Sequence, residues 1–263
     1  MGFLTFIDDY GVDIRRTPNQ TIDQLALLST MQYFYFKMYT EVYLSPLSMA
    51  YERHLQKAVE LAIQSEIITA DEIADLGDDT LLYKINNGSP NQVKGHAAQE
   101  ARDLLQSLTS RRPFVSVAAF KYAGLKKEHV ENQEVIEIKR EYKENFVKAF
   151  KNPLRLTELE TAISEDLKGI PVLCCLLPDP EKIKPTDVPL YDAGKKVTTL
   201  RTEDEVHYKS LEKMADEHFA IRLRVPLSES ELVRKNLDKL VTSFYEHSEK
   251  LINREKKINE TKK

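Results

Sequence analysis

The chain has 263 residues, 41% hydrophobic and 30% charged, with a formal net charge of −4 at pH 7. This length can bury a sizeable core, and the charge gives no general attraction to nucleic acid or to an anionic membrane, so neither is an expected partner. No apolar run approaches the roughly 20 residues of a membrane span. The low glycine content and the abundance of Lys, Glu, Leu and Ala favour a mostly helical fold.

The only cysteines, Cys174 and Cys175, are adjacent in the segment PVLCCLL. Neighbouring side chains in a strand point to opposite faces, so this pair is poorly placed to form a disulfide or to share a metal ion. We interpret both as small apolar residues of a buried strand. A chain without a disulfide framework fits a reducing compartment, and the expected location is the cytoplasm.

Residues 1–20 read as an extended entry, and Thr21 can cap the first helix. Its apolar positions recur in steps of three and four, which predicts one broad buried face. They are Ile22, Leu25, Leu28, Met31, Tyr35, Met38, Tyr39 and Val42. Pro46 ends or kinks this helix, because its ring blocks an interior hydrogen bond.

Three further helices are predicted before residue 111. The first covers residues 48–65, and the second is a short helix that Thr69 caps, with Glu72 three residues on as in a capping box. Asp78 and Asp79 are placed to cap the next helix, and a longer one covers residues 92–108. Residues 1–110 are therefore predicted to be a helical bundle.

The pattern changes at Arg111, where PFVSVAAF has the Val and Phe content of a strand. The segments that follow suggest two helices (126–150 and 156–167), the strand PVLCCLL, a hairpin around residues 192–194, a helix (202–214), the alternating strand HFAIRLRVP, and a last helix (228–253). The predicted fold is mostly α with an α+β part at residues 111–263. In that part a small antiparallel sheet is covered by helices.

An aromatic set in the first helix is the best indication of a partner surface: Tyr33, Phe34, Tyr35, Phe36, Tyr39 and Tyr43. Aromatic faces can stack on a nucleotide base, although core packing is the more common use of such residues. So many rings cannot all face one core, and some should meet another domain, a subunit or a ligand. Arg111 and Arg112 can bind a phosphate, or can flank a strand in contact with water.

Sequence motifs for chemistry are missing. The chain has no Walker loop, no G-x-S-x-G element and no Gly-rich phosphate cradle. His96 and Glu100 stand four residues apart on a predicted helix, but a zinc site needs three or four convergent ligands. We therefore name no catalytic residue and no metal-binding residue.

Several segments, in order, resemble the C-terminal part of HD-domain phosphohydrolases of the deoxynucleotide triphosphohydrolase type: MQYFYFKMYTEVY, YERHLQKAVELA, LGDDTLLYKI, HAAQEARDLLQSL with SRRPFVSVAAF, PLYDAGKKVTTL and RLRVPL. The chain contains no His-Asp dipeptide, the signature of that family's metal site. It also has Gln32 where members commonly have Arg, and Ser45 and Pro46 where they have His-Lys.

The resemblance implies a non-catalytic region or subunit of such an enzyme, serving as a scaffold, in oligomerisation or in a regulatory nucleotide contact. Expected partners are a second copy or a catalytic HD-domain chain, with nucleotide as a possible ligand. No cofactor is expected in this chain, since a divalent metal would belong to a separate or missing HD half. The alternatives are a stand-alone interaction module without nucleotide binding, and a diverged hydrolase with an unrecognised site.

Overall fold

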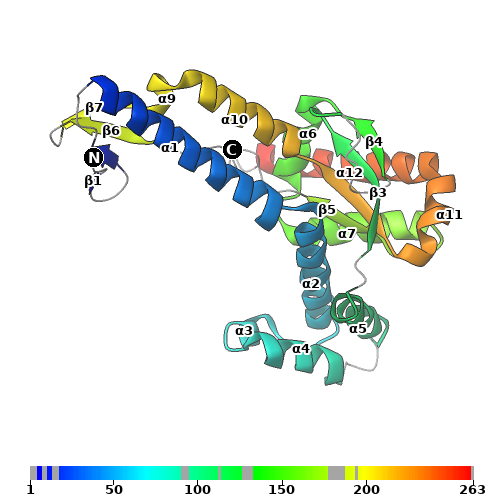
Figure 1. The fold of residues 1–263 in the computed structure, drawn as a ribbon. Coiled ribbons are helices and arrows are strands. Elements are labelled where there is room, and N and C mark those ends of the chain that lie inside the picture. Colours follow the sequence, from blue (N-terminus) through cyan, green and yellow to red (C-terminus); the bar gives the residue numbers. More distant parts are fainter. Residues whose placement is uncertain are drawn as a thin grey trace. The chain divides into compact units, whose positions relative to one another are not determined.

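The structure is a computed structural model that describes residues 5–7, 11–13, 18–89, 95–111, 114–125, 133–176, 187–192 and 195–261. The chain divides into two compact units, each built from two stretches of sequence (Figure 1). Unit 1 contains Met1–Ser45 and Pro178–Phe219, and unit 2 contains Pro46–Leu177 and Ala220–Lys263.

Unit 1 is a small sheet with a long helix and its neighbours. Its elements are β1 (Thr5–Ile7), β2 (Gly11–Asp13), α1 (Pro18–Met38), the π-helical turn η1 (Tyr39–Tyr43), β6 (Pro189–Asp192), β7 (Lys195–Thr199), α9 (Leu200–Glu203) and α10 (Glu205–His218). The strand order is β1-β2-β6-β7, and the β2–β6 pair is parallel. β6 and β7 form the predicted antiparallel hairpin; Ala193 and Gly194 of its expected turn lie outside the described residues.

One side of α1 packs on the rest of unit 1. Leu28 joins a buried cluster with Leu190, Leu200 and Tyr208. Beside it, Ser29 Oγ donates to Asp204 Oδ2 at 2.8 Å, and Gln32 Nε2 donates to the Tyr208 hydroxyl at 2.7 Å. These contacts come from a segment about 175 positions away in the sequence, and they fix which side of α1 faces inward.

Unit 2 surrounds a second sheet with helices. Its elements are α2 (Pro46–Gln64), α3 (Ala70–Ile73), α4 (Asp78–Asn87), α5 (Gly95–Thr109), β3 (Val115–Lys121), β4 (Glu134–Glu137), α6 (Arg140–Ala149), α7 (Pro153–Asp166), β5 (Leu173–Leu176), β8 (Ile221–Val225), η3 (Leu227–Glu229), α11 (Ser230–Lys235) and α12 (Leu237–Thr261). The strand order is β4-β3-β8-β5. Both β8 and most of β3 are buried on successive residues, so the sheet is covered on both faces.

Two apolar clusters hold unit 2 together. Around α2 and α5 lies an aliphatic cluster that includes Leu61, Ile85 and Leu105. Around α6, α12 and β3 lies an aromatic cluster, in which Phe120 stacks on Phe244 with ring centroids 4.1 Å apart. Buried rings of this size contribute strongly to the stability of a core.

The predicted fold class is confirmed: helices dominate, and an α+β part includes the sheet of unit 2. The prediction of an antiparallel sheet is wrong in one respect, because β3 and β4 are parallel and the sheet is mixed. The expected helix over residues 126–150 is also corrected. Residues 126–132 lie outside the described residues, and the rest forms strand β4 and helix α6.

The compact units do not follow the expected division at Arg111. Helices α2 and α5 belong with the sheet of unit 2, and the guanidinium of buried Arg224 shows why. From β8 it donates to the carbonyl oxygen of Phe114 at 2.9 Å and to that of Pro46 at 3.0 Å. The region 1–110 is not purely helical either, since β1 and β2 pair within unit 1.

Local helix signals are accurate in part. The predicted cap at Thr21 is wrong, because α1 already begins at Pro18. Pro46 is the first residue of α2, a position where a backbone N–H would have no intrahelical acceptor in any case. Thr69 and Glu72 form the predicted capping box. Asp78 and Asp79 lie in the first turn of α4, while the N-cap itself is Gly77. Among the described residues, none of the helices combines the length and the apolar character that crossing a membrane requires.

Candidate functional site

The aromatic residues predicted as a partner surface lie on α1 and η1 of unit 1. Phe34 is 66% exposed, Tyr35 63% and Tyr43 57%, and Tyr33 is also exposed, although less so. Phe36 differs, since only 3% of it is exposed and its ring is a core group. The surface is therefore formed by the rings on either side of Phe36 in the sequence.

Three of the tyrosines form a ladder along the helix. Tyr35 stacks on Tyr39 with ring centroids 6.0 Å apart and planes 17° from parallel, and Tyr39 meets Tyr43 at the same centroid distance. Between them the helix widens, and the Leu44 amide donates to the Tyr39 carbonyl five residues back. Such π-helical turns are frequent at functional sites.

An exposed apolar surface runs along α1 and continues into η1, and we call it the outer stripe. It consists of Leu27, Met31, Phe34, Tyr35, Met38 and Val42, each between 45% and 66% exposed. Apart from the adjacent pair Phe34 and Tyr35, the residues recur in steps of three and four, and the wide turn η1 brings Val42 back onto the side of Met38. Within unit 1, the described residues leave much of this surface exposed.

The outer stripe corrects the prediction of a single buried face. Met31, Tyr35, Met38 and Val42 were expected to face inward with Leu28, and all four are exposed. The helix is apolar on nearly every side, so its inner side is selected by Asp204 and Tyr208 rather than by its own pattern. Leu27 was not singled out from the sequence. Its angular position around the helix axis, taken relative to Leu28 and Gln32, would have placed it on the stripe.

Charge is scarce on this surface. Between residues 24 and 45 the only charged side chains are Lys37 and Glu41. They pair at 2.6 Å, and this bond raises the pKa of the Lys37 ammonium. By helix spacing, Thr30, Lys37 and Glu41 fall on one edge of the stripe, while Tyr35 and Tyr39 fall on the other edge. The stripe therefore has a polar edge and an aromatic edge.

The two arginines of the predicted site belong to a different part of the chain. Arg111 is exposed in unit 2, directly after α5, with a left-handed backbone φ of 54°. Arg112 lies outside the described residues.

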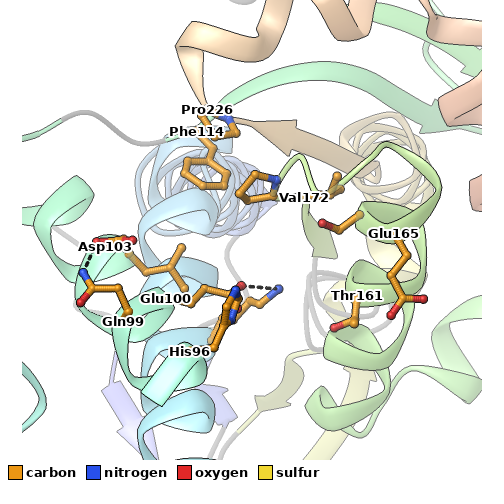
Figure 2. Close-up of a pocket in the computed structure, with 14 residues that line it drawn as sticks. His96, Gln99, Glu100, Asp103, Phe114, Thr161, Glu165, Val172 and Pro226 are labelled. Atoms are coloured by element: carbon orange, nitrogen blue, oxygen red, sulfur yellow. Dashed lines mark hydrogen bonds and ion pairs between the residues drawn. The ribbon is translucent and has the colours of Figure 1, made fainter. Parts of the chain in front are cut away.

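Unit 2 contains a cavity of about 600 Å³ between α5 and α7. Figure 2 shows His96 and Glu100 on the α5 wall, Thr161 and Glu165 on the α7 wall, and Phe114 among the apolar residues at one end. This volume is in the usual range for small-molecule sites. The sequence analysis singled out His96 and Glu100 but did not predict the cavity, because its walls come from separate segments with no common motif.

A buried ionic network borders the cavity. Glu160 is fully buried, and its carboxylate accepts two bonds from Arg53, at 2.8 Å each, and one from the Cys174 amide at 2.7 Å. Lys57 lies 3.2 Å from the same carboxylate and 3.7 Å from Glu100. Burial alone would raise the pKa of Glu160, but Lys57 and Arg53 lower it, so the carboxylate stays ionised.

The cavity offers little to a polyphosphate. Among the described side chains that line it, Lys57 is the one lysine or arginine, and it already pairs with Glu160. Glu100, Asp103 and Glu165 add negative charge. Because like charges repel, this lining disfavours a nucleoside triphosphate.

The described part of the chain contains no assembled site for a metal ion or for a reactive thiol. His96 and Glu100 both line the cavity, yet no group of three or more His, Cys, Asp or Glu side chains that could hold a metal ion occurs among the described residues. Cys174 and Cys175 are buried, as predicted for a buried strand. Burial raises the pKa of the Cys175 thiol to about 11, so it is a poor nucleophile at neutral pH.

Comparisons with protein-family models, with curated proteins and with solved structures give no significant match. The resemblance to HD-domain phosphohydrolases therefore rests on the sequence segments alone.

Proposed function

We propose that this chain is a non-catalytic region or subunit of an HD-type phosphohydrolase relative, and that it works as a scaffold that self-associates through the outer stripe. The observation that carries the proposal is the stripe itself. Six apolar side chains on one side of one helix are each about half exposed or more. Contiguous apolar surface of this kind marks an interaction site on a folded protein.

The lack of catalysis is proposed on chemical grounds. Phosphoester hydrolysis in the family that the sequence resembles needs a metal-activated water. The chain has no His-Asp dipeptide, and Ser45 and Pro46 replace a His-Lys pair that would supply cationic donors to phosphates. Release of phosphate or triphosphate from dGTP in the presence of Mn, Mg, Ni or Co is expected to equal that of a denatured control. Turnover that a chelator abolishes would contradict this part of the proposal.

A protein partner suits the outer stripe better than a nucleotide does. The exposed rings offer stacking faces, but the nearby cation, Lys37, is already bound to Glu41. A nucleotide that stacked here would find no other cation among the described side chains of α1 and η1 for its phosphates. A second apolar helix would bury the stripe without that cost.

Self-association is tested by light scattering of the purified chain at micromolar concentration. We expect a mass above that of the 30.3 kDa chain. The double variant Phe34→Ser/Tyr35→Ser should shift the mass to that of the monomer, because it removes the two largest rings of the stripe. Tyr83→Ser is the matched control, since Tyr83 is a 68% exposed aromatic residue on α4 of unit 2.

The same measurement distinguishes the alternatives. A wild-type monomer at high micromolar concentration would overturn self-association and favour a separate catalytic HD-domain chain as the partner of the stripe. A rise in melting temperature with dGTP that the Phe34→Ser/Tyr35→Ser variant loses would favour a regulatory nucleotide contact instead.

A further inference from the structure

The edges of the outer stripe constrain how two copies can meet. In a parallel two-fold pair of helices, each edge of one stripe lies against the opposite edge of the other. The Lys37–Glu41 pair of one copy would then lie along the tyrosine ladder of the second copy. In an antiparallel two-fold pair, like edges meet, so the polar edges face one another and the two ladders do the same.

Desolvation favours the antiparallel arrangement. Covering an ion pair with aromatic rings removes water from both charges without supplying new hydrogen bonds. In the antiparallel pair, Lys37 and Glu41 stay on a shared polar edge, which keeps contact with water and with the second copy's Thr30. The opposed helix dipoles of an antiparallel pair also favour this arrangement.

The order of side chains along the stripe sets the register. Read from either end, the stripe passes from an aliphatic residue to a methionine to an aromatic ring, with the same spacing. An antiparallel pair centred between Phe34 and Tyr35 therefore places Leu27 opposite Val42 and Met31 opposite Met38. A register shifted by one turn leaves one end of the stripe uncovered.

We infer that two copies of this chain pair through α1 and η1 as an antiparallel two-fold helix pair, centred at Phe34 and Tyr35. This inference rests on the proposed self-association and adds its direction and register. Six half-exposed side chains per copy bury on the order of 1,000 Å² in total, which is near the lower limit for a specific interface. The dimer should therefore dissociate on dilution.

Cysteine cross-linking tests the geometry on the full chain. Leu27 and Val42 are exposed, so L27C, V42C and the double variant L27C/V42C should fold as the wild type does. The native thiols do not interfere, because both are buried and their pKa values are raised. In the antiparallel pair, position 27 of one copy lies near position 42 of the other, but about 20 Å from position 27.

Under mild oxidation, the double variant should become a disulfide-linked dimer while each single variant stays unlinked. A disulfide needs Cβ atoms about 4 Å apart, so the pattern reports direction directly. Linked dimers of both single variants would indicate a parallel pair and overturn the inference. A dimeric mass without linkage in any variant would also overturn it while leaving self-association intact, whereas a monomeric wild type would refute both.

Discussion

Helices α1 and α2 follow one another in the chain but differ in which side chains they expose and which they bury. α1 presents apolar side chains outward and makes polar contacts inward, through Ser29 and Gln32. α2 buries charged side chains, with Arg53 at 3% exposure and Lys57 at 4%. The charges of α2 are matched by carboxylates of unit 2, so that helix is complete within its unit. The outer stripe stays largely exposed among the described residues of unit 1, and this difference is why we propose α1 as the surface for assembly.

The largest effect is expected in the ionic network beside α2. Glu160→Gln removes the carboxylate that holds Arg53 and Lys57, and leaves two buried cations without it. Breaking a buried pair in this way costs about 3–5 kcal/mol in the free energy of unfolding. Chemical denaturation measures this loss.

Glu158→Gln is the control for that variant. Glu158 lies on the same helix, α7, and pairs with Arg254 at 3.1 Å, but both side chains are more than half exposed. An exposed pair contributes about 0–1 kcal/mol. Equal losses in the free energy of unfolding for the two variants would show that the buried network of unit 2 contributes no more to stability than an exposed ion pair does.

Two phenylalanines of α1 that are two residues apart test the difference between the inner side of the helix and the outer stripe. Phe36 is buried and Phe34 is exposed. At concentrations low enough to keep the chain monomeric, Phe36→Ala should lower the free energy of unfolding by about 3 kcal/mol. Phe34→Ala should change it by no more than about 0.5 kcal/mol. A large loss with Phe34→Ala in the monomer would mean that the outer stripe packs inside the chain.

A smaller effect is expected from acid through His54 of α2. Its ring bonds the Ala50 carbonyl at 2.7 Å through Nδ1 and accepts the Phe114 amide at 3.3 Å through Nε2, so the neutral ring is the form that the fold requires. Burial lowers the pKa of His54 below its usual value of 6.5. The contribution to stability is therefore complete above about pH 6.5 and is lost as the pH falls toward the lower folded-state pKa.

The loss amounts to about 1.4 kcal/mol for each unit by which the pKa is lowered. Denaturant titrations of the wild type between about pH 7.5 and pH 5 measure it, with His54→Gln as the reference that lacks the titrating ring. The same dependence of the free energy of unfolding on pH in both proteins would show that His54 does not cause the loss of stability in acid.

Sequence reasoning succeeded where the signal was local. The strands β3 and β8, the hairpin of β6 and β7 and the helix break at Pro46 follow from residues within a few positions of each element. It failed where distant segments decide. The parallel pairing of β2 with β6 joins segments about 180 residues apart, and no pattern inside either strand indicates it.

The candidate site divides in the same way. The sequence analysis located the aromatic set of α1. It did not predict which of these rings are exposed, because Asp204 and Tyr208 select the inner side of the helix. The cavity of unit 2 was missed altogether. Its walls include residues of α2, α5 and α7, and what Lys57, Glu100 and Thr161 share is position in the fold rather than spacing in the chain.

The smallest expected effect concerns the capping box of α3, a local feature that the sequence predicted and the structure confirms. The Thr69 hydroxyl accepts the Glu72 amide, and the Glu72 carboxylate accepts the Thr69 amide at 2.8 Å. Thr69→Ala removes the first of these bonds and should lower the free energy of unfolding by about 1 kcal/mol, since a donor of the first turn loses its partner. Thr69→Ser keeps the oxygen and should stay within about 0.3 kcal/mol of the wild type. Because α3 has only four residues and none of them is buried, the loss can be confined to local opening, which amide hydrogen exchange at Glu72 detects when global denaturation does not. Unchanged exchange at Glu72 in Thr69→Ala would show that the turn is held by its chain connections to α2 and α4 rather than by its cap.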